Sequence, residues 1–311
     1  MDSVRLCAVI CIIGIAALAE LKGEVACDGV CGDGCSARLG RLAGHGCAAE
    51  AECGGGAPLK SLPPLSVTNL KVRVGARRPF RLLHVSDSHL SRLDSRSDES
   101  QVSFALARSR NGREWGEYYL DAAMNLAGRE GVAIVHTGDI MEFASPANLE
   151  AAGRRLRTWD VMACPGNHEY WLSADRMNVE SNRIALASAL EQVFPHGVAA
   201  AVREIEGVSF FVFDNASGSV SRETAAAFER TVLRGCPIVM VCHVPLQCPE
   251  FDDDVSVCKG EFVERARREP LVKAVLTGHV HRRMFGRFSP TADEFVVGAL
   301  FDGCATMMEF E

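Results

Sequence analysis

Residues 132–139 read VAIVHTGD, an apolar run that ends in a glycine and an aspartate. A short continuous apolar run that stops at a turn residue is typical of a strand buried on both faces. A glycine at its end permits a positive φ or a close backbone approach, so the chain can turn sharply there. This stretch therefore predicts a buried strand that carries the carboxylate of Asp139 to one edge of a sheet.

Four further motifs follow the same plan, in which an apolar run leads into polar residues. They are Asp87-Ser88-His89 after 80–86, Gly166-Asn167-His168-Glu169 after 161–163, His243 after 238–242, and Gly278-His279-Val280-His281 after 272–276. Helical periodicity occurs between the strand-like runs, at 114–129, 149–155, 182–194, 222–233 and 262–268. A further strand is expected at 208–213, and two late strands at 295–299 and 305–310. Alternating strands and helices favour an α/β layered fold.

The polar motifs are expected to meet, because ligands in open α/β sheets gather outside the carboxyl ends of the strands. Together they offer carboxylates, imidazoles and one amide, which suits Mn, Fe, Zn or Co rather than a calcium cage or a thiolate site. Asp87 and His89 are two residues apart, as are His279 and His281. In an extended strand each pair would share one face. We expect a centre that holds two metal ions.

The five motifs, in this order, resemble those of the calcineurin-like metallophosphoesterase superfamily, over residues 87–281. The resemblance implies an α/β fold of four layers, a double β-sandwich flanked by α-helices. It also implies two ligand sets that share a bridging Asp139: Asp87, His89, Asp139 and His281 for one metal, and Asp139, Asn167, His243 and His279 for the other. His168 matches the family's non-ligand histidine beside the phosphate.

The same resemblance implies hydrolysis of a phosphodiester or phosphomonoester through a metal-bridging hydroxide. The cofactors would be two divalent or trivalent transition-metal ions, and the substrate a small phosphate ester. Two departures from the family's motifs argue against two of its subfamilies. Gly138-Asp139 is not followed by the Asp-Arg-Gly of the protein Ser/Thr phosphatases, and Glu142 stands where purple acid phosphatases have a tyrosine. The chain is more similar to the broader phosphodiesterases and phosphohydrolases.

Three side chains near the motifs have open roles. Glu169 either orients His168 and its loop or is solvated, and Trp171 either lines a substrate pocket or packs on the motif loop. His84 is either a partner of the ligands or a core histidine. Specificity is expected from the loops at 90–113, 142–148, 170–180 and 244–261, whose sequences do not identify a substrate.

The N-terminal part differs from the rest of the chain. Residues 1–19 are predicted to be a signal peptide, because Arg5 precedes an apolar run that would span about 21 Å as a helix, against a bilayer core of about 30 Å. Residues 20–66 are predicted to be a Cys/Gly-rich leader and linker, and 67–311 the catalytic domain. The protein would be exported, periplasmic or secreted, with no membrane span after cleavage. A membrane tether by an uncleaved N-terminus is the alternative.

The thirteen cysteines and the net charge of −7 bear on the possible disulfides and on the class of binding partner. Export permits disulfides, and a bridge between Cys248 and Cys258 is one candidate. The negative charge argues against a nucleic-acid backbone as partner. Two other functions stay open: a non-catalytic metal-binding interaction module on the same fold, and hydrolysis of a non-phosphorus ester or amide. Nothing in the sequence indicates the oligomeric state.

Overall fold

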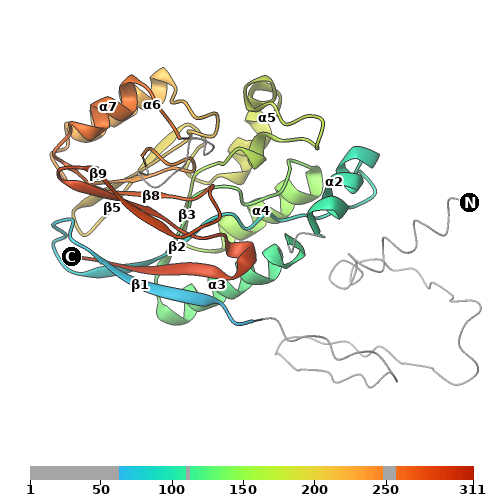
Figure 1. Ribbon diagram of the computed structural model, residues 1–311, viewed down its shortest axis with the longest axis horizontal. Coiled ribbons are helices and arrows are strands. Elements are labelled where there is room, and N and C mark those ends of the chain that lie inside the picture. Colours follow the sequence, from blue (N-terminus) through green and yellow to red (C-terminus); the bar gives the residue numbers. More distant parts are fainter. Residues whose placement is uncertain (1–62, 110–112, 248–256) are drawn as a thin grey trace, which may run out of the picture. The chain divides into compact units, whose positions relative to one another are not determined.

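A computed structural model describes residues 63–109, 113–247 and 257–311. The predicted signal peptide, nearly all of the predicted leader, and Cys248 of the candidate disulfide lie outside these residues. In the described part, two β-sheets pack face to face and helices cover their outer faces (Figure 1). Four layers result, as the resemblance of the motifs implies.

The first sheet has five strands in the order β1-β11-β2-β3-β4. Their bounds are β1 Ser66–Val72, β11 Cys304–Phe310, β2 Phe80–Val85, β3 Ala133–His136 and β4 Val161–Ala163. Strands β2, β3 and β4 are parallel, with Val85 opposite His136 and His136 opposite Ala163. Three polar motifs therefore leave this sheet at one edge.

The second sheet has six strands in the order β5-β6-β7-β8-β10-β9. Their bounds are β5 Ala200–Ile205, β6 Val208–Phe213, β7 Ile238–Val241, β8 Val272–Thr277, β10 Ala292–Val296 and β9 Met284–Ser289. The adjacent strands β6, β7, β8 and β10 are parallel to one another. The edge strands β5 and β9 pair antiparallel with β6 and β10. The motifs after β7 and β8 therefore leave this sheet side by side.

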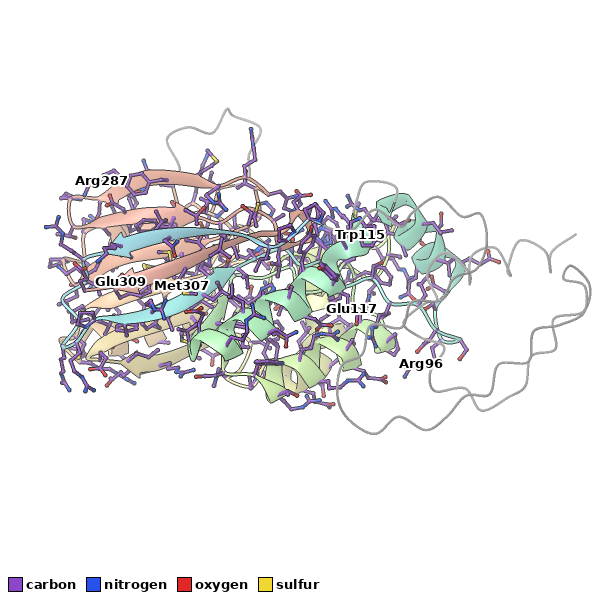
Figure 2. The ribbon with its side chains drawn as sticks, turned by 90° about the horizontal axis from the view of Figure 1, so that it is seen from below. Arg96, Trp115, Glu117, Arg287, Met307 and Glu309 are labelled. Atoms are coloured by element: carbon purple, nitrogen blue, oxygen red, sulfur yellow. The ribbon has the colours of Figure 1, made fainter. Side chains whose placement is uncertain are left out.

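The inner strands are mostly apolar because both of their faces are largely buried. In β3, Val135 points into the core between the sheets and Ile134 into the core under the helices. That outer core packs the first sheet against α3 (Gly116–Glu130), α4 (Pro146–Thr158) and α5 (Val179–Val193), and a third core packs the second sheet against α6 (Arg222–Val232) and α7 (Glu261–Arg267). Met307 of β11 is 5% exposed and belongs to this outer core. Figure 2 labels it together with Trp115 and Glu117, which lie near the start of α3.

Some predicted elements were wrong or missing. The strand expected at 295–299 is wrong at its end, because β10 stops at Val296 and the chain bends into the short helix η3 (Leu300–Asp302). The edge strands β5 and β9 and the helix α2 (Glu99–Ser109) were not predicted. Two more short helices are η1 (Arg113–Trp115) and η2 (His168–Tyr170). Among the described helices, none has the length and apolarity needed to cross a membrane.

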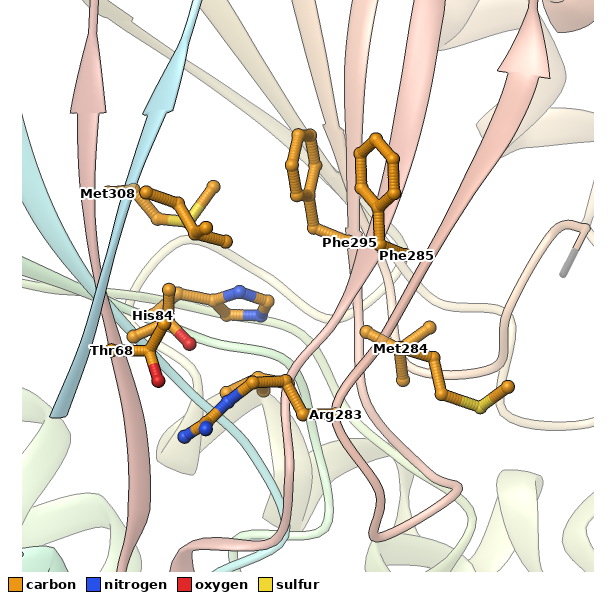
Figure 3. A pocket seen from close by; sticks show the side chains of 11 residues that line it. Thr68, His84, Arg283, Met284, Phe285, Phe295 and Met308 are labelled. Atoms are coloured by element: carbon orange, nitrogen blue, oxygen red, sulfur yellow. The ribbon is translucent and has the colours of Figure 1, made fainter. Parts of the chain in front are cut away.

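A cavity of about 170 Å³ lies between the two sheets, lined by residues of β1, β2, β9, β10 and β11 (Figure 3). His84 and Arg283 are among its lining residues, and the remaining lining is largely apolar. The His84 Nε2 atom lies 3.1 Å from the Thr137 hydroxyl, and burial lowers the pKa of His84 to about 3. His84 is therefore a neutral core histidine, and none of the predicted metal ligands lines this cavity.

Candidate metal centre

The backbone turns left-handed at the residues predicted to bind metal. Of the six non-glycine residues with positive φ in the described part, five are predicted ligands: Asp87, His89, Asp139, His279 and His281, with φ from 50° to 71°. The expectation that Asp87 and His89, or His279 and His281, share a face of an extended strand was therefore wrong. Strand β2 ends at Val85, and the chain then turns at alternate residues. Such conformations cost free energy and cluster at functional sites.

The motif glycines serve two different purposes. Gly138 has a φ of +87°, which glycine adopts without strain. Gly166 and Gly278 are needed for space instead. A Cβ on Gly166 would lie 2.2 Å from Oδ1 of Asp139, and a Cβ on Gly278 would lie 1.8 Å from Oγ of Ser86. At these two positions, the absence of a side chain lets the loops that carry the motifs come together.

The first cluster comprises Asp87, His89, Asp139 and His281. Nε2 of His89 lies 3.3 Å from Nε2 of His281 and 3.8 Å from carboxylate oxygens of both aspartates. Nε2 of His281 lies 3.2 Å from Oδ1 of Asp87, yet that buried oxygen accepts no hydrogen bond. A buried carboxylate oxygen without a donor is the kind of atom that a cation satisfies.

The second cluster surrounds Nε2 of His243. This atom lies 3.2 Å from Oδ2 of Asp139, 3.1 Å from Oδ1 of Asn167 and 3.1 Å from Nδ1 of His279. On the other side of the ring, Nδ1 lies 2.7 Å from the Thr137 carbonyl oxygen, which fits an Nδ1–H donor and leaves Nε2 as the ligand atom. Although burial would lower it, the Asp139 carboxylate raises the pKa of His243 to about 9, so a metal would displace a proton from Nε2. Since Asp139 belongs to both clusters, the structure brings all seven predicted ligands together.

The shorter separations within these clusters fit a transition metal. Metal–nitrogen bonds of about 2.0–2.1 Å at angles of roughly 90–109° place donor atoms about 2.9–3.4 Å apart. The contacts of 3.1–3.3 Å between imidazole nitrogens lie in this range. Although burial would raise it, the imidazoles of His243 and His168 hold the pKa of Asp139 well below its usual range. A carboxylate whose ionised form is favoured in this way suits a position shared by two cations.

Glu142 is a residue of the centre that the sequence did not reveal. Its buried carboxylate lies 3.0 Å from Nδ1 of His89 and 3.3 Å from Nδ1 of His168. Arg108 and Arg113 reach the same carboxylate at 3.0 Å. Burial opposes ionisation, but the two imidazoles lower the pKa of Glu142 far below its usual range. One carboxylate thus contacts a predicted ligand, the predicted catalytic histidine and two guanidinium groups.

Glu169 is buried and holds two of the motif loops together. Its carboxylate accepts backbone N–H bonds from Asp139 (2.9 Å), Met141 (3.0 Å) and Gly166 (2.6 Å). Burial and the nearby Asp139 carboxylate raise the pKa of Glu169 to about 8, against the effect of the backbone donors. Of the two roles left open by the sequence, orientation of the loop is therefore the one observed.

His168 is almost fully buried beside the two clusters. Its backbone N–H donates to Oδ1 of Asp139, and its Nε2 lies 3.9 Å from Oδ2 of the same residue. Its Nδ1 lies 2.8 Å from the Glu142 carbonyl oxygen. The Trp171 ring packs on the imidazole with centroids 3.7 Å apart, so packing on the motif loop is the observed role of Trp171. The imidazole is thus held from both sides with Nε2 toward the centre.

Comparison with known proteins adds a family match. Residues 80–283 match the family model of the calcineurin-like phosphoesterases. Among solved structures, the chain is similar to a dimetal phosphatase from Danio rerio (14% identity, 72% of this chain and 88% of that chain covered, TM-score 0.47). It is also similar to a 5'-nucleotidase from Candida albicans (13%, 76% and 48%, TM-score 0.43) and a phosphopantetheinyl hydrolase from Mycobacterium tuberculosis (15%, 71% and 90%, TM-score 0.40). No curated protein matches the chain.

Proposed function

The chain belongs to the calcineurin-like phosphoesterase family and is a metal-dependent hydrolase of phosphate esters, and we propose that it acts on a small phosphodiester or phosphomonoester at a two-metal centre. The observation that carries this proposal is the convergence of seven ligand side chains from two sheets, whose closest donor atoms lie 3.1–3.3 Å apart. In the proposed assignment, Asp139 bridges the two metal positions. Asp87, His89 and His281 complete one position, and Asn167, His243 and His279 complete the other.

The donor set supports ions such as Mn, Fe, Zn or Co, because it combines imidazole nitrogens with carboxylate and amide oxygens and has no thiolate. When bound, such an ion pair supplies Lewis acidity and lowers the pKa of water. The remaining chemistry belongs to the protein. Nδ1 of His168 is engaged by Glu142, so Nε2 is the atom that can hold a proton and pass it to the leaving oxygen. Positioned acid–base groups contribute about 10²–10⁴ in rate.

Charge around the centre also supports an anionic substrate. Asp87, Asp139 and Glu142 would together repel a phosphate ester if nothing offset them. Arg108 and Arg113 both contact Glu142 at 3.0 Å and supply two positive charges to its one negative charge. Although no arginine follows Asp139 in the sequence, these two guanidinium groups reach the centre from the segment between β2 and α3. We propose that they keep this side of the site receptive to anions.

The direct test is an activity screen on the purified chain from residue 20 onward, loaded separately with Mn²⁺, Fe²⁺, Zn²⁺ and Co²⁺. Bis-p-nitrophenyl phosphate reports diesterase activity and p-nitrophenyl phosphate reports monoesterase activity. We expect hydrolysis of at least one of them with at least one metal, inhibited competitively by vanadate. Failure of all combinations would refute the proposed substrate class.

Export is the second part of the proposal, and it rests on the sequence of residues 1–19 alone. We propose that cleavage follows Ala19 and that the catalytic domain, residues 67–311, acts outside the cytosol. The mass of the N-terminal peptide from the full chain, expressed in a secreting host, tests this step. An intact Met1 on membrane-bound protein would instead support the tethered alternative.

A further inference from the structure

The backbone from His243 to Gln247, here called the strap, leaves the second sheet just before the centre. Strand β7 ends at Val241, and the last sheet-like bond nearby runs from the Cys242 N–H to the Leu276 carbonyl. The strap is buried or nearly so along its length. Its backbone N–H groups therefore need acceptors other than the sheet, because an unpaired buried amide is costly.

Asn215, which follows β6, supplies the acceptor for the first half of the strap. Its Oδ1 accepts the N–H groups of His243 and Val244, both at 3.0 Å, and its Nδ2 donates to the Val244 carbonyl at 2.6 Å. The side chain is fully buried. One amide thus fixes the backbone on both sides of the His243 Cα, which determines where its imidazole projects.

Glu294 of β10 supplies the acceptors for the second half. Its two carboxylate oxygens accept the N–H groups of Leu246 at 2.8 Å and Gln247 at 2.7 Å. The Thr277 hydroxyl donates to Oε1 at 3.3 Å. Because Pro245 has no N–H, Asn215 and Glu294 together bind every backbone N–H group of the strap.

Through Thr277, Glu294 also reaches the other histidine of this metal position. Thr277 is the last residue of β8 and is followed by Gly278 and His279. The Gly278 N–H donates to the His243 carbonyl at 3.0 Å, so the strap and the start of the His279 loop already share a backbone bond. Glu294 adds a second tie between them, from a strand that carries no predicted ligand.

The environment of Glu294 is unfavourable for a residue with a merely structural role. It is fully buried, and burial raises its pKa to about 7. Arg267 lowers this pKa to a lesser extent, and its own ion pair is with Glu264. A buried carboxylate satisfied only by neutral donors lowers stability relative to an apolar residue of the same size. Proteins retain a residue that lowers stability in this way mainly at functional sites.

We propose that Asn215 and Glu294 are positioning residues for the metal position of His243 and His279, an inference that rests on the proposed function. They act by fixing the strap and tying it to Thr277, so that the two imidazoles approach one point. Residues that orient metal ligands from behind change metal affinity by about 10–100-fold when they are replaced. The effect should be confined to one of the two metal positions.

Calorimetric titration of metal-free protein with Mn²⁺ tests the proposal. Glu294→Gln keeps the volume but presents an NH₂ group to a backbone N–H. We expect two ions to bind the wild type, and one of them to bind the variant about 10–100-fold more weakly while the other is unchanged. Excess Mn²⁺ should then restore kcat. Asp293→Asn is the matched control, since Asp293 neighbours Glu294 on β10 and pairs with Arg287. Arg287 is labelled in Figure 2. The titration of this variant should equal that of the wild type.

Thr277→Val is the second variant, because it removes only the hydroxyl and keeps the test decisive if Glu294→Gln does not fold. It should weaken the same ion by a smaller factor. Equal weakening of both ions, unchanged affinities, or fewer than two ions bound by the wild type would each overturn the inference. Hydrolysis by the wild type is measured separately, so a protein that binds two ions without cleaving either nitrophenyl ester would refute the proposed function and leave this test intact.

Discussion

Replacing Glu142 by glutamine should destabilise the metal-free protein by about 3–5 kcal/mol, which is the usual cost of removing one partner from a buried ion pair. The structure supports a value in this range because the Glu142 side chain is 0% exposed, while those of Arg113 and Arg108 are 12% and 24% exposed. Solvent therefore screens the two guanidinium groups only slightly. The substitution leaves both of them without their shared counter-ion.

The free energy of unfolding of both proteins is to be measured by urea titration at pH 7.5 in the presence of a chelator. Glu150→Gln is the control, because Glu150 pairs with Arg96 at the surface, where the side chains are 60% and 46% exposed. That pair is worth at most about 1 kcal/mol. The reasoning would be refuted if Glu142→Gln cost no more than Glu150→Gln, since the buried carboxylate would then contribute no more than an exposed one.

Three further predictions concern turnover, packing and pH. His168→Ala should lower kcat by about 10²–10⁴ with metal content unchanged by elemental analysis; loss of metal would contradict its non-ligand role. Gly278→Ala should destabilise by about 1–3 kcal/mol in urea titration, because its Cβ would lie 1.8 Å from Oγ of Ser86, and Ser86→Gly in the same chain should recover part of this. Burial raises the pKa of Glu294 from 4.5 to about 7, so its contribution to the stability of the metal-free protein is full below pH 4.5 and lost as pH rises through about 7. At about 1.4 kcal/mol for each pKa unit, the loss is about 3 kcal/mol, and unfolding titrations at pH 4 and pH 8 should show a correspondingly smaller change for Glu294→Gln.

The inner strands and the meeting of the motifs were predictable because they depend on local pattern. Runs such as 132–135 place apolar side chains on both faces of the strand, and parallel strands deliver the residues that follow them to one edge. The edge strands were missed for the same reason. In β5, Arg203 and Glu204 interrupt the apolar pattern, and in β9 Arg287 does so, as exposed edges require.

The left-handed turns could not be read from strand periodicity, but one signal was present. Every predicted ligand with positive φ is an aspartate or a histidine, and these residue types are enriched several-fold in that conformation. The same residues that bind metals are thus those that best tolerate the turn. A spacing of two between Asp87 and His89 was interpreted as a shared strand face, when it reflects two successive turns.

The side chains that hold the ligand loops in place could not be predicted from the sequence, for a physical reason. Once the chain leaves a sheet at each motif, its buried amides have no strand partner and must find side-chain acceptors. Glu169 accepts three backbone N–H groups in these loops, and Asn215 and Glu294 accept two each. Glu294 lies 48 residues from Leu246, whose N–H it binds, so no local pattern links them. The left-handed residues each cost roughly 1–2 kcal/mol, and five of them approach the whole net stability of a typical domain, about 5–15 kcal/mol. A site built this way requires neighbours that hold each loop in place, and those neighbours are therefore as much a part of the centre as the residues predicted to contact the metal.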